Sequence, residues 1–294
     1  MEDLDKWKEA SKIAAQALKY GASLIKPGAS LLEVTELTEK KIFELGGKPA
    51  FPVQISCDAI AAHYCAVPND STIFEKQVAS IDVGVHVDGC IGDNATTVDL
   101  SGENATLVKA SRDALNSAIS AVKEQATLGE IGSAIHDTIT KLGFAPIRNL
   151  SGHGLGIYKV HTKPSVPNYD TGDSSKIMNM AFAIEPFATN GKGVIYESGN
   201  PSIFTLTNKK PVRNRMTREI IKQIESYNGL PFCTRWLTDK FREGVVMFAL
   251  REMTNLEMLH EHPPLVDQDK GLVSQAEHTI YIEDDKVEVL TLLD

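Results

Sequence analysis

The feature that most constrains the fold of this 294-residue chain is the stretch "SIDVGVHVDGCIGDNA" at residues 80–95. Alternating valines on one side and a Cys-Ile pair on the other favour two strands, and the Asp88-Gly89 dipeptide between them is a strong signal for a two-residue hairpin turn. Two further aspartates, Asp82 and Asp93, lie inside this predicted hairpin, where a charged carboxylate is costly. The fold must therefore supply a reason for both acids.

The turn determines which residues face each other across the hairpin. With a two-residue loop, Asp82 lies opposite Ala95 and Asp93 lies opposite Gly84. Side chains alternate between faces, so the two aspartates share one face as diagonal neighbours, about 7–8 Å apart at the backbone. A three-residue loop with a bulge would reverse this parity. Converging carboxylates repel each other, and a bound cation is the simplest remedy; two acids on an exposed face are the alternative.

Three later segments each place one potential ligand among apolar residues. His153 lies in "NLSGHGLGIYKVH", Glu185 in "MAFAIEPF" and Glu277 in "SQAEHTIYI". Each signal alone is weak, because a single histidine is commonly a core or surface residue and a single glutamate is commonly an edge charge. Together with the hairpin they offer four carboxylates and one imidazole, a set that suits Mn(II), Fe(II), Co(II) or Zn(II) better than a thiolate-bound metal.

The helical pattern occurs twice along the chain. Helices are predicted over residues 3–25 and from Ser30, which forms a capping box with Glu33, to Gly46-Gly47. After the hairpin a helix is predicted over residues 104–126, followed by a break at Leu128-Gly129 and a second helix that ends at Gly143. This order predicts an α+β fold with two related halves around one sheet and a cleft between equivalent strands.

Residues 208–262 interrupt this order. They carry helical periods where the second half should complete its hairpin, so we expect a helical insertion there and a main domain formed by residues 1–207 and 263–294. The basic stretch "NKKPVRNRMTR" at the start of the insertion is interpreted as a solvated surface rather than a docking patch. The segments "AEHTIYI" and "VEVLTLL" are predicted to form a closing strand pair.

Composition limits the classes of partner. The formal net charge of −9 and the pI near 5.4 oppose binding to nucleic acid or to an anionic membrane. No apolar stretch approaches the ~20 residues of a membrane span, and the acidic start "MEDLDKWKEA" differs from a secretory signal, so a cytoplasmic protein is expected. The four cysteines have no CxxC spacing and are expected to be free and mostly buried.

The segments "IDVGVHVDGCIGDNA", "SGHGLGIYKVH", "AIEPF" and "AEHTI" occur in the order seen in the methionine aminopeptidases, and the chain resembles this family over essentially its whole length. The resemblance implies the pita-bread fold, an α+β architecture with two pseudo-symmetric halves around a curved antiparallel sheet. The segments "LPFCTRWL" and "HEHPPL" look like the helical, winged-helix-like subdomain of the type 2 enzymes. Pro186 departs from many type 2 members, without altering the expected ligand Glu185.

The resemblance also implies the residues of the site. A centre of two divalent ions (Co, Mn, Fe or Zn) is implied, with five ligands: Asp82, Asp93, His153, Glu185 and Glu277. The segment "AFPVQISCDAIAAHYCAVPND" looks like the family's pocket segment, which would place His63 beside the substrate and Phe51 in the methionine pocket. His161 matches the second active-site histidine. Family chemistry implies that a metal-bridging hydroxide attacks the peptide carbonyl, while Glu185 carries a proton.

Two other histidines are expected to lie outside the site. His86 shares the face of the aspartates but lies near the turn, where we expect it to form a hydrogen bond at the hairpin tip. His278 should point away from the metal if Glu277 points towards it. The "GHGLG" stretch lacks the GxGxxG spacing, and "HEHPP" around His260 lacks the second histidine of HExxH.

The resemblance implies removal of an N-terminal Met, from peptides and nascent chains, when the next residue is small. A transient contact with the ribosome is compatible with that substrate, and neither nucleic acid nor a membrane is an expected partner; the default oligomeric state is a monomer. One rival is a catalytically silent pita-bread protein that binds other proteins or RNA. The other is an Xaa-Pro peptidase, which carries a large N-terminal domain for which the roughly eighty residues before Asp82 leave no room.

Overall fold

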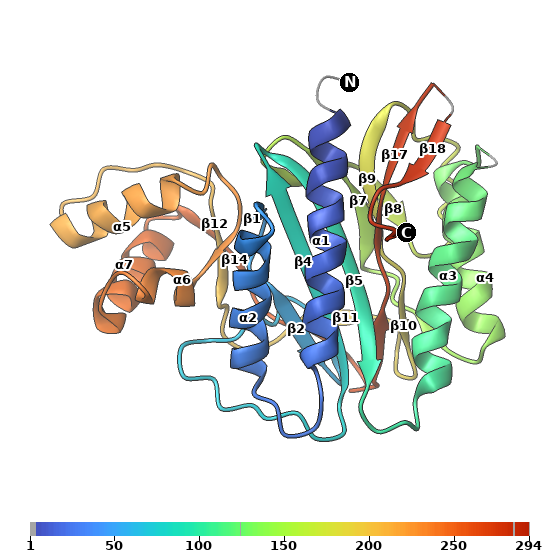
Figure 1. The fold of residues 1–294 in the computed structure, drawn as a ribbon, viewed down its shortest axis with the longest axis horizontal. Coiled ribbons are helices and arrows are strands. Elements are labelled where there is room, and N and C mark those ends of the chain that lie inside the picture. The colour runs from blue at the N-terminus through green and yellow to red at the C-terminus, as the bar shows by residue number, and fades with distance from the viewer. Residues whose placement is uncertain (1–3, 124, 285, 294) are drawn as a thin grey trace.

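The computed structural model describes residues 4–123, 125–284 and 286–293 and contains the two expected α+β halves with an appended helical group (Figure 1). Helices α1 (Leu4–Leu24) and α2 (Leu31–Glu44) begin the first half. The side chains of Trp7, Ala10 and Ala14 are buried, as their helical spacing predicts. The Ser30 hydroxyl accepts a hydrogen bond from the Glu33 backbone N–H at 3.4 Å, which confirms it as the cap of α2.

The predicted hairpin is formed by β4 (Val78–Val87) and β5 (Cys90–Asp99), with Asp82 opposite Ala95 and Gly84 opposite Asp93. The φ angles of Asp88 and Gly89 are 49° and 92°. Positive φ at both central positions is what a type I′ turn requires, so the even-length loop and its parity are confirmed. Strands β1 (Lys48–Pro49) and β2 (Gln54–Cys57) pair with β4 to complete a four-stranded sheet.

The second half repeats the order with α3 (Ala105–Lys123) and α4 (Leu128–Lys141), and Gly143 follows the end of α4. The predicted break at Leu128-Gly129 is wrong, since both residues belong to the first turn of α4. Thr127 is the N-cap, and it exchanges hydrogen bonds with Glu130 in a capping box. A cap that satisfies two free backbone donors starts the helix despite the glycine.

The strands of the second half form a five-stranded sheet in the order β18-β17-β9-β7-β8. Its members are β7 (Ser151–Gly156), β8 (Lys159–Pro167), β9 (Met180–Ile184), β17 (His278–Glu283) and β18 (Lys286–Val289), and β17 with β18 is the predicted closing pair. Two three-stranded sheets are made by β6 (Ala145–Pro146), β10 (Phe187–Thr189) and β16 (Val273–Gln275), and by β3 (Ile60–Ala62), β11 (Ile195–Glu197) and β15 (Leu265–Asp267).

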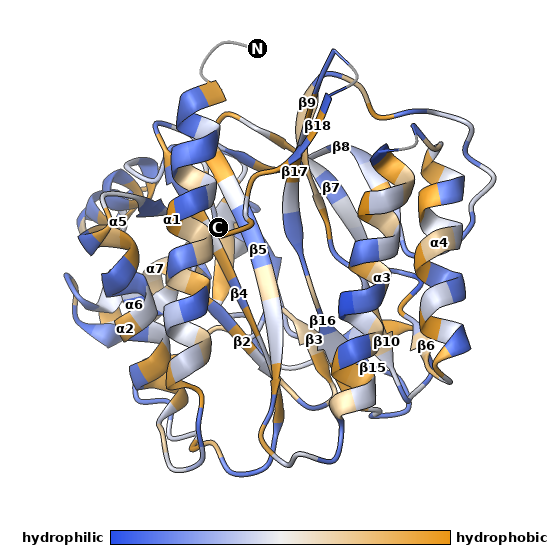
Figure 2. Ribbon diagram, turned by 45° about the vertical axis from the view of Figure 1, so that its right-hand side comes forward, coloured by the Kyte–Doolittle hydropathy of each residue, from blue (hydrophilic) through white to orange (hydrophobic). Residues whose placement is uncertain are grey.

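The two halves are joined at the centre of the molecule. Ala95 in β5 bridges to Glu277, and the Thr279 hydroxyl in β17 accepts from the Asp93 N–H at 2.7 Å and donates to the Asp93 carbonyl at 2.8 Å. Helices α1 and α3 lie across the same side of these strands, with the last described residues between them (Figure 2). The strands that carry the acids of both halves are thereby held side by side.

The insertion forms a group of its own at one side of the molecule (Figure 1). It contains α5 (Arg215–Glu225), α6 (Thr234–Thr238) and α7 (Glu243–Asn255), and its sheet is made by β12 (Ile203–Leu206), β13 (Phe232–Cys233) and β14 (Leu259–His262). Strand β12 lies before residue 208, the predicted start of the insertion, yet it pairs with both β13 and β14. The predicted boundaries of the insertion, at residues 208 and 262, stay a prediction.

A buried ion pair fastens the insertion to the first half. Arg235 of α6 donates from both terminal nitrogens to the Glu39 carboxylate of α2, at 2.7 Å each, and both side chains are buried. The Trp236 indole N–H (3.0 Å) and the Val53 backbone N–H (3.3 Å) also donate to this carboxylate. The geometry is bidentate, and the carboxylate accepts hydrogen bonds from two segments, α6 and the residue before β2.

Two expectations from composition can also be compared with the structure. The four cysteines are free, and Cys65, Cys90 and Cys233 are buried, as expected. Among the described residues, no helix combines the length and the apolar character that crossing a membrane requires.

Because removal of one partner of a buried pair leaves an uncompensated charge, we expect Arg235→Met to lower the free energy of unfolding by about 3 kcal/mol or more. Urea denaturation followed by circular dichroism measures this change. The exposed pair between Lys41 and Glu44 provides the control, since solvent screens it and Lys41→Met should change stability far less than Arg235→Met does. Equal effects of the two substitutions would contradict the anchoring role of Arg235.

Candidate active site

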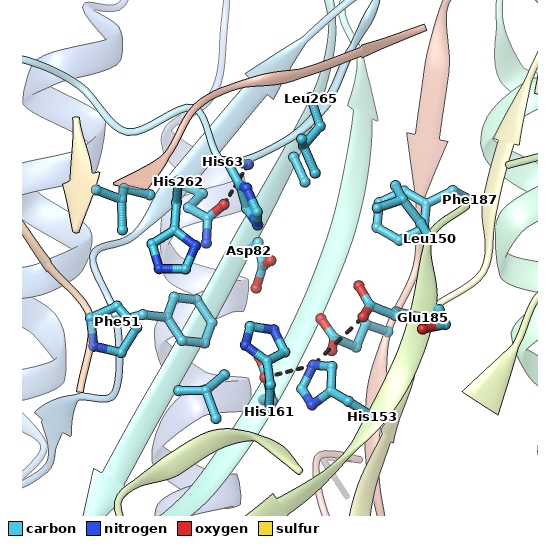
Figure 3. Close-up of a pocket in the computed structure, with 18 of the residues that line it drawn as sticks. Phe51, His63, Asp82, Leu150, His153, His161, Glu185, Phe187, His262 and Leu265 are labelled. Carbon is cyan, nitrogen blue, oxygen red and sulfur yellow. Dashed lines mark hydrogen bonds and ion pairs between the residues drawn. The ribbon is translucent and has the colours of Figure 1, made fainter. Parts of the chain in front are cut away.

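A cavity of about 340 Å³ lies where the two halves and the insertion meet, and all eight site residues expected from the sequence line it (Figure 3). These residues are Phe51, His63, Asp82, Asp93, His153, His161, Glu185 and Glu277. They come from β4, β5, β7, β8 and the loops next to β2, β3, β9 and β17. The structure thus brings together residues that are separated by more than two hundred positions in the chain.

Gly84 explains how the hairpin admits a pocket next to its acids. A Cβ atom built on Gly84, which lies opposite Asp93, would collide with the ring of Phe51. Any larger residue at position 84 would displace the ring. The absence of a side chain at Gly84 thus leaves room that an aromatic ring fills.

Carboxylates and one imidazole form a compact cluster at the cavity wall. Asp93, His153 and Glu277 each contribute one ligand atom, and these atoms all lie within 4.8 Å of one another. The Nε2 atom of His153 is also 3.5 Å from Glu185 Oε1. Asp82 is partly buried and lies on the hairpin face shared with Asp93. The cluster therefore has the residue types and the spacing of a site for hard divalent cations.

Several buried oxygens of this cluster have no hydrogen-bond partner among the described residues. They are Oδ1 of Asp82, Oδ1 of Asp93 and Oε2 of Glu277. Buried polar atoms in native proteins are nearly always satisfied, and an unpartnered one indicates a missing ligand such as an ion or water. Buried carboxylate oxygens without donors are what a site for cations would contain.

Burial disfavours the charged forms of the carboxyl groups in this cluster when no cation is bound. Desolvation raises the pKa of Asp82 to about 7 and also raises the pKa of Asp93, which the neighbouring Asp82 raises further. The pKa values of Glu185 and Glu277 rise for the same two reasons, burial first and nearby carboxylates second. Bound cations would replace the shared protons, so metal binding and proton release are coupled.

Besides the cluster, the cavity contains further histidines, some from the insertion and some from the main body. The His153 and His161 rings are 4.4 Å apart at their centroids, and His262 lies 5.5 Å from His63 and 4.6 Å from His260. Burial lowers the pKa of His63 to about 4 and that of His262 to about 3. These two rings are therefore neutral near pH 7.

Sequence reasoning missed His260 and His262 as cavity residues. Their signal was present, because "HEHPP" places the two histidines two positions apart on β14, and alternate residues of a strand share a face. It also missed Gln54, which lines the cavity from β2. An isolated glutamine gives no chemical signal in a sequence.

The two histidines expected outside the site are indeed outside it. The Nδ1 atom of His86 accepts a hydrogen bond from the Gly89 backbone N–H at 3.3 Å, at the tip of the hairpin. His278 forms a hydrogen bond with the Thr291 hydroxyl at 2.8 Å and lines a different cavity from Glu277. Neighbouring residues of β17 point to opposite faces, as the strand period requires.

Comparison with known proteins identifies the family. Residues 5–219, more than half of the chain, match the model of metallopeptidase family M24. The chain belongs to this family. The methionine aminopeptidase of Archaeoglobus fulgidus is 46% identical over 286 residues, which cover 96% of each chain. That of Pyrococcus abyssi is 44% identical over 98% of this chain and 99% of its own.

Solved structures show the same fold in other M24-like proteins. The methionine aminopeptidase of Thermotoga maritima superposes with a TM-score of 0.72 at 24% identity, covering 99% of this chain and 97% of that one. The prolidase of Pyrococcus furiosus gives a TM-score of 0.61 at 17% identity, covering all of this chain and 64% of that one. The pita-bread fold expected from the sequence is thereby confirmed.

Membership of metallopeptidase family M24 implies divalent metal ions, and the donor set fits them. Carboxylate oxygens and an imidazole nitrogen are suitable ligands for such ions, and Asp82, Asp93 and Glu277 each have a buried oxygen without a hydrogen-bond partner among the described residues. No thiol lines the cavity. The number and identity of the ions belong to the proposal below.

The raised pKa of Asp82 predicts how stability depends on pH in a chelator. In the unfolded chain this carboxyl ionises near pH 4, whereas in the fold it ionises near pH 7, so wild type loses stability as the pH rises through this range. Asp82→Asn removes that loss. Its stability relative to wild type should therefore increase between pH 5 and pH 8, by on the order of 2 kcal/mol in urea denaturation.

Glu36→Gln is the matched control, because Glu36 is exposed on α2. The stability of this variant relative to wild type should be the same at pH 5 and at pH 8. A stability difference for Asp82→Asn that does not change with pH would show that this carboxyl is not held neutral in the metal-free fold.

Proposed function

We propose that the chain is a metal-dependent aminopeptidase that removes the N-terminal methionine of proteins and peptides when the next residue is small. The observation that carries this proposal is one cavity that combines a four-carboxylate, one-imidazole cluster with apolar side chains. The 46% identity to a methionine aminopeptidase over nearly the whole chain supports it. The preference for a small second residue comes from the resemblance to that family.

Five residues would hold two divalent ions. Asp82 would bind one ion, His153 and Glu185 the other, and Asp93 and Glu277 would be shared by both; the ions would be Mn, Co, Fe or Zn. When bound, such ions supply Lewis acidity that polarises a carbonyl group and makes water a nucleophile near neutral pH. The unpartnered oxygens of Asp82, Asp93 and Glu277 support this set of ligands.

The cavity would also determine which end of a peptide reacts. The acidic cluster favours the free α-amino group of the first residue, and an N-acetylated terminus lacks that group. The methionine side chain, which is unbranched and flexible, would lie among the apolar lining of the cavity. That lining includes Phe51, Val160, Ile203 and Leu265. A single residue would be removed because the amino group and the scissile bond are then separated by one residue only.

Protein side chains would handle the proton and the developing negative charge. Glu185, 3.5 Å from His153, would accept a proton from the attacking water and deliver it to the leaving amine nitrogen as the carbon–nitrogen bond breaks. His161 would donate a hydrogen bond to the oxyanion, and His63 would contact the scissile peptide. The burial of His63 supports its role as a neutral hydrogen-bonding group.

We extend the proposal to the setting in which the enzyme works. New proteins begin with methionine, so the enzyme would act in the cytoplasm on nascent chains, and a transient contact with the ribosome would bring it to them. A monomer would be the active form.

Purified protein loaded with Mn(II) or Co(II) should release free methionine from a Met-Ala-Ser peptide but not from its N-acetylated form. Quantification of the free amino acid measures this activity. Glu277→Ala removes a shared ligand and should abolish the release, and a chelator should do the same to wild type until metal is restored. The control Glu36→Ala alters an exposed acid of α2 and should retain full activity.

Other outcomes would point to the rival functions. Equal cleavage of the acetylated peptide would refute binding of the free amine. Faster cleavage of an Xaa-Pro peptide than of Met-Ala-Ser would indicate a prolidase-like enzyme, and no cleavage of either peptide by the metal-loaded protein would indicate a catalytically silent member of the family.

A further inference from the structure

The backbone of His63 adopts a conformation that histidine rarely takes. Its φ angle is 65°, in the left-handed region, where the side chain is crowded by the backbone. Such strained residues are kept only when surrounding interactions hold them, and they concentrate at functional sites. An interaction with a neighbouring group must therefore hold the backbone of His63 in this conformation.

The side chain of Gln54 supplies that interaction. The His63 backbone N–H donates a hydrogen bond to the Gln54 Oε1 atom at 2.7 Å, which is the dashed line beside His63 in Figure 3. A backbone N–H can only donate, so the amide oxygen must face His63 and the amide nitrogen must point elsewhere. The orientation of the Gln54 amide is thus fixed by this contact.

Gln54 is placed to connect the histidine with the acid cluster. It is 8% exposed, lines the cavity and lies directly opposite Asp82 in the pairing of β2 with β4. The next residue, Ile55, donates its backbone N–H to the Tyr64 carbonyl at 2.9 Å, so the two segments are also joined beyond the glutamine. Gln54 therefore ties the turn that carries His63 to the strand that carries a proposed metal ligand.

We propose that Gln54 is a positioning residue for the reaction: its side-chain carbonyl holds the strained backbone of His63 so that the imidazole keeps a fixed place beside the scissile peptide. The inference rests on the proposed function, since it assigns Gln54 a task in the same site. Gln54 acts only through His63. A neutral amide suits this place, because a carboxylate there would add a fifth acid opposite Asp82.

The test compares Gln54→Met with wild type in the full-length protein loaded with Mn(II). Methionine preserves the length of the side chain and removes the acceptor. We expect kcat for Met-Ala-Ser to fall about 10–100-fold, the scale expected when a reacting group is misplaced, while KM stays within about twofold. In the His63→Ala background, the Gln54→Met substitution should change kcat by less than about twofold, because the imidazole that Gln54 positions is absent.

A measurement without substrate reports the contact itself. Amide hydrogen exchange of metal-free protein, followed by NMR, should show that the His63 amide exchanges at least about 10-fold faster in Gln54→Met than in wild type. Ser56→Ala is the control variant: Ser56 is buried on the same strand, and its hydroxyl has no hydrogen-bond partner among the described residues. It should change neither kcat nor the exchange rate.

The outcomes separate this inference from the proposed function. An equal loss of kcat with and without His63, or an unchanged exchange rate of the His63 amide, would overturn the positioning role. If wild type releases no methionine from any peptide, the proposed function fails, and the exchange measurement still decides whether Gln54 holds His63. Should Gln54→Met fail to fold, Gln54→Asn, which is too short to reach, is measured in the same two assays.

Discussion

Mutual repulsion among four carboxylates in one desolvated cavity is the constraint on which the rest of this structure depends. Burial raises the pKa values of Asp82, Asp93, Glu185 and Glu277, and neighbouring carboxylates raise those of Asp93, Glu185 and Glu277 further. Such a cluster opposes folding unless strong packing holds it. The two hydrophobic clusters that α1 with α2 and α3 with α4 form against the strands provide that packing.

The duplicated architecture explains how the acids reach one point. Each half contributes a pair of helices that cover strands, and the halves meet where Ala95 bridges to Glu277 and Thr279 binds both backbone groups of Asp93. The geometry of the cluster is thus set by backbone pairing rather than by flexible side chains. Sites built on strands are held more firmly than sites built on loops, which suits a centre that must bind ions at fixed separations.

Much of this arrangement could be predicted from the sequence, for physical reasons that differ between residues. The prediction that Asp82 and Asp93 share one face of the hairpin followed from the two-residue turn, because the length of the turn fixes which residues pair across the two strands. The candidate ligands of the second half were proposed from isolated charges in apolar segments, and the resemblance to methionine aminopeptidases grouped them into one site. The start of α4 was misplaced because Gly129 looked like a break, whereas the Thr127 cap decides the boundary. Gln54 was missed because an isolated glutamine gives no chemical signal in a sequence. The spacing of His260 and His262 places them on one face of a strand, but that this face lines the cavity depends on the pairing of β14 with the distant strand β12.

The ion pair between Arg235 and Glu39 has a consequence for how substrates enter. The insertion supplies His260 and His262 to one side of the cavity, and it could tilt away only by separating two desolvated charges that also engage Trp236 and Val53. Such a hinge movement is costly. We therefore expect the mouth of the cavity to keep a constant width, so that selection among peptides would depend on rigid shape matching rather than on a closing lid.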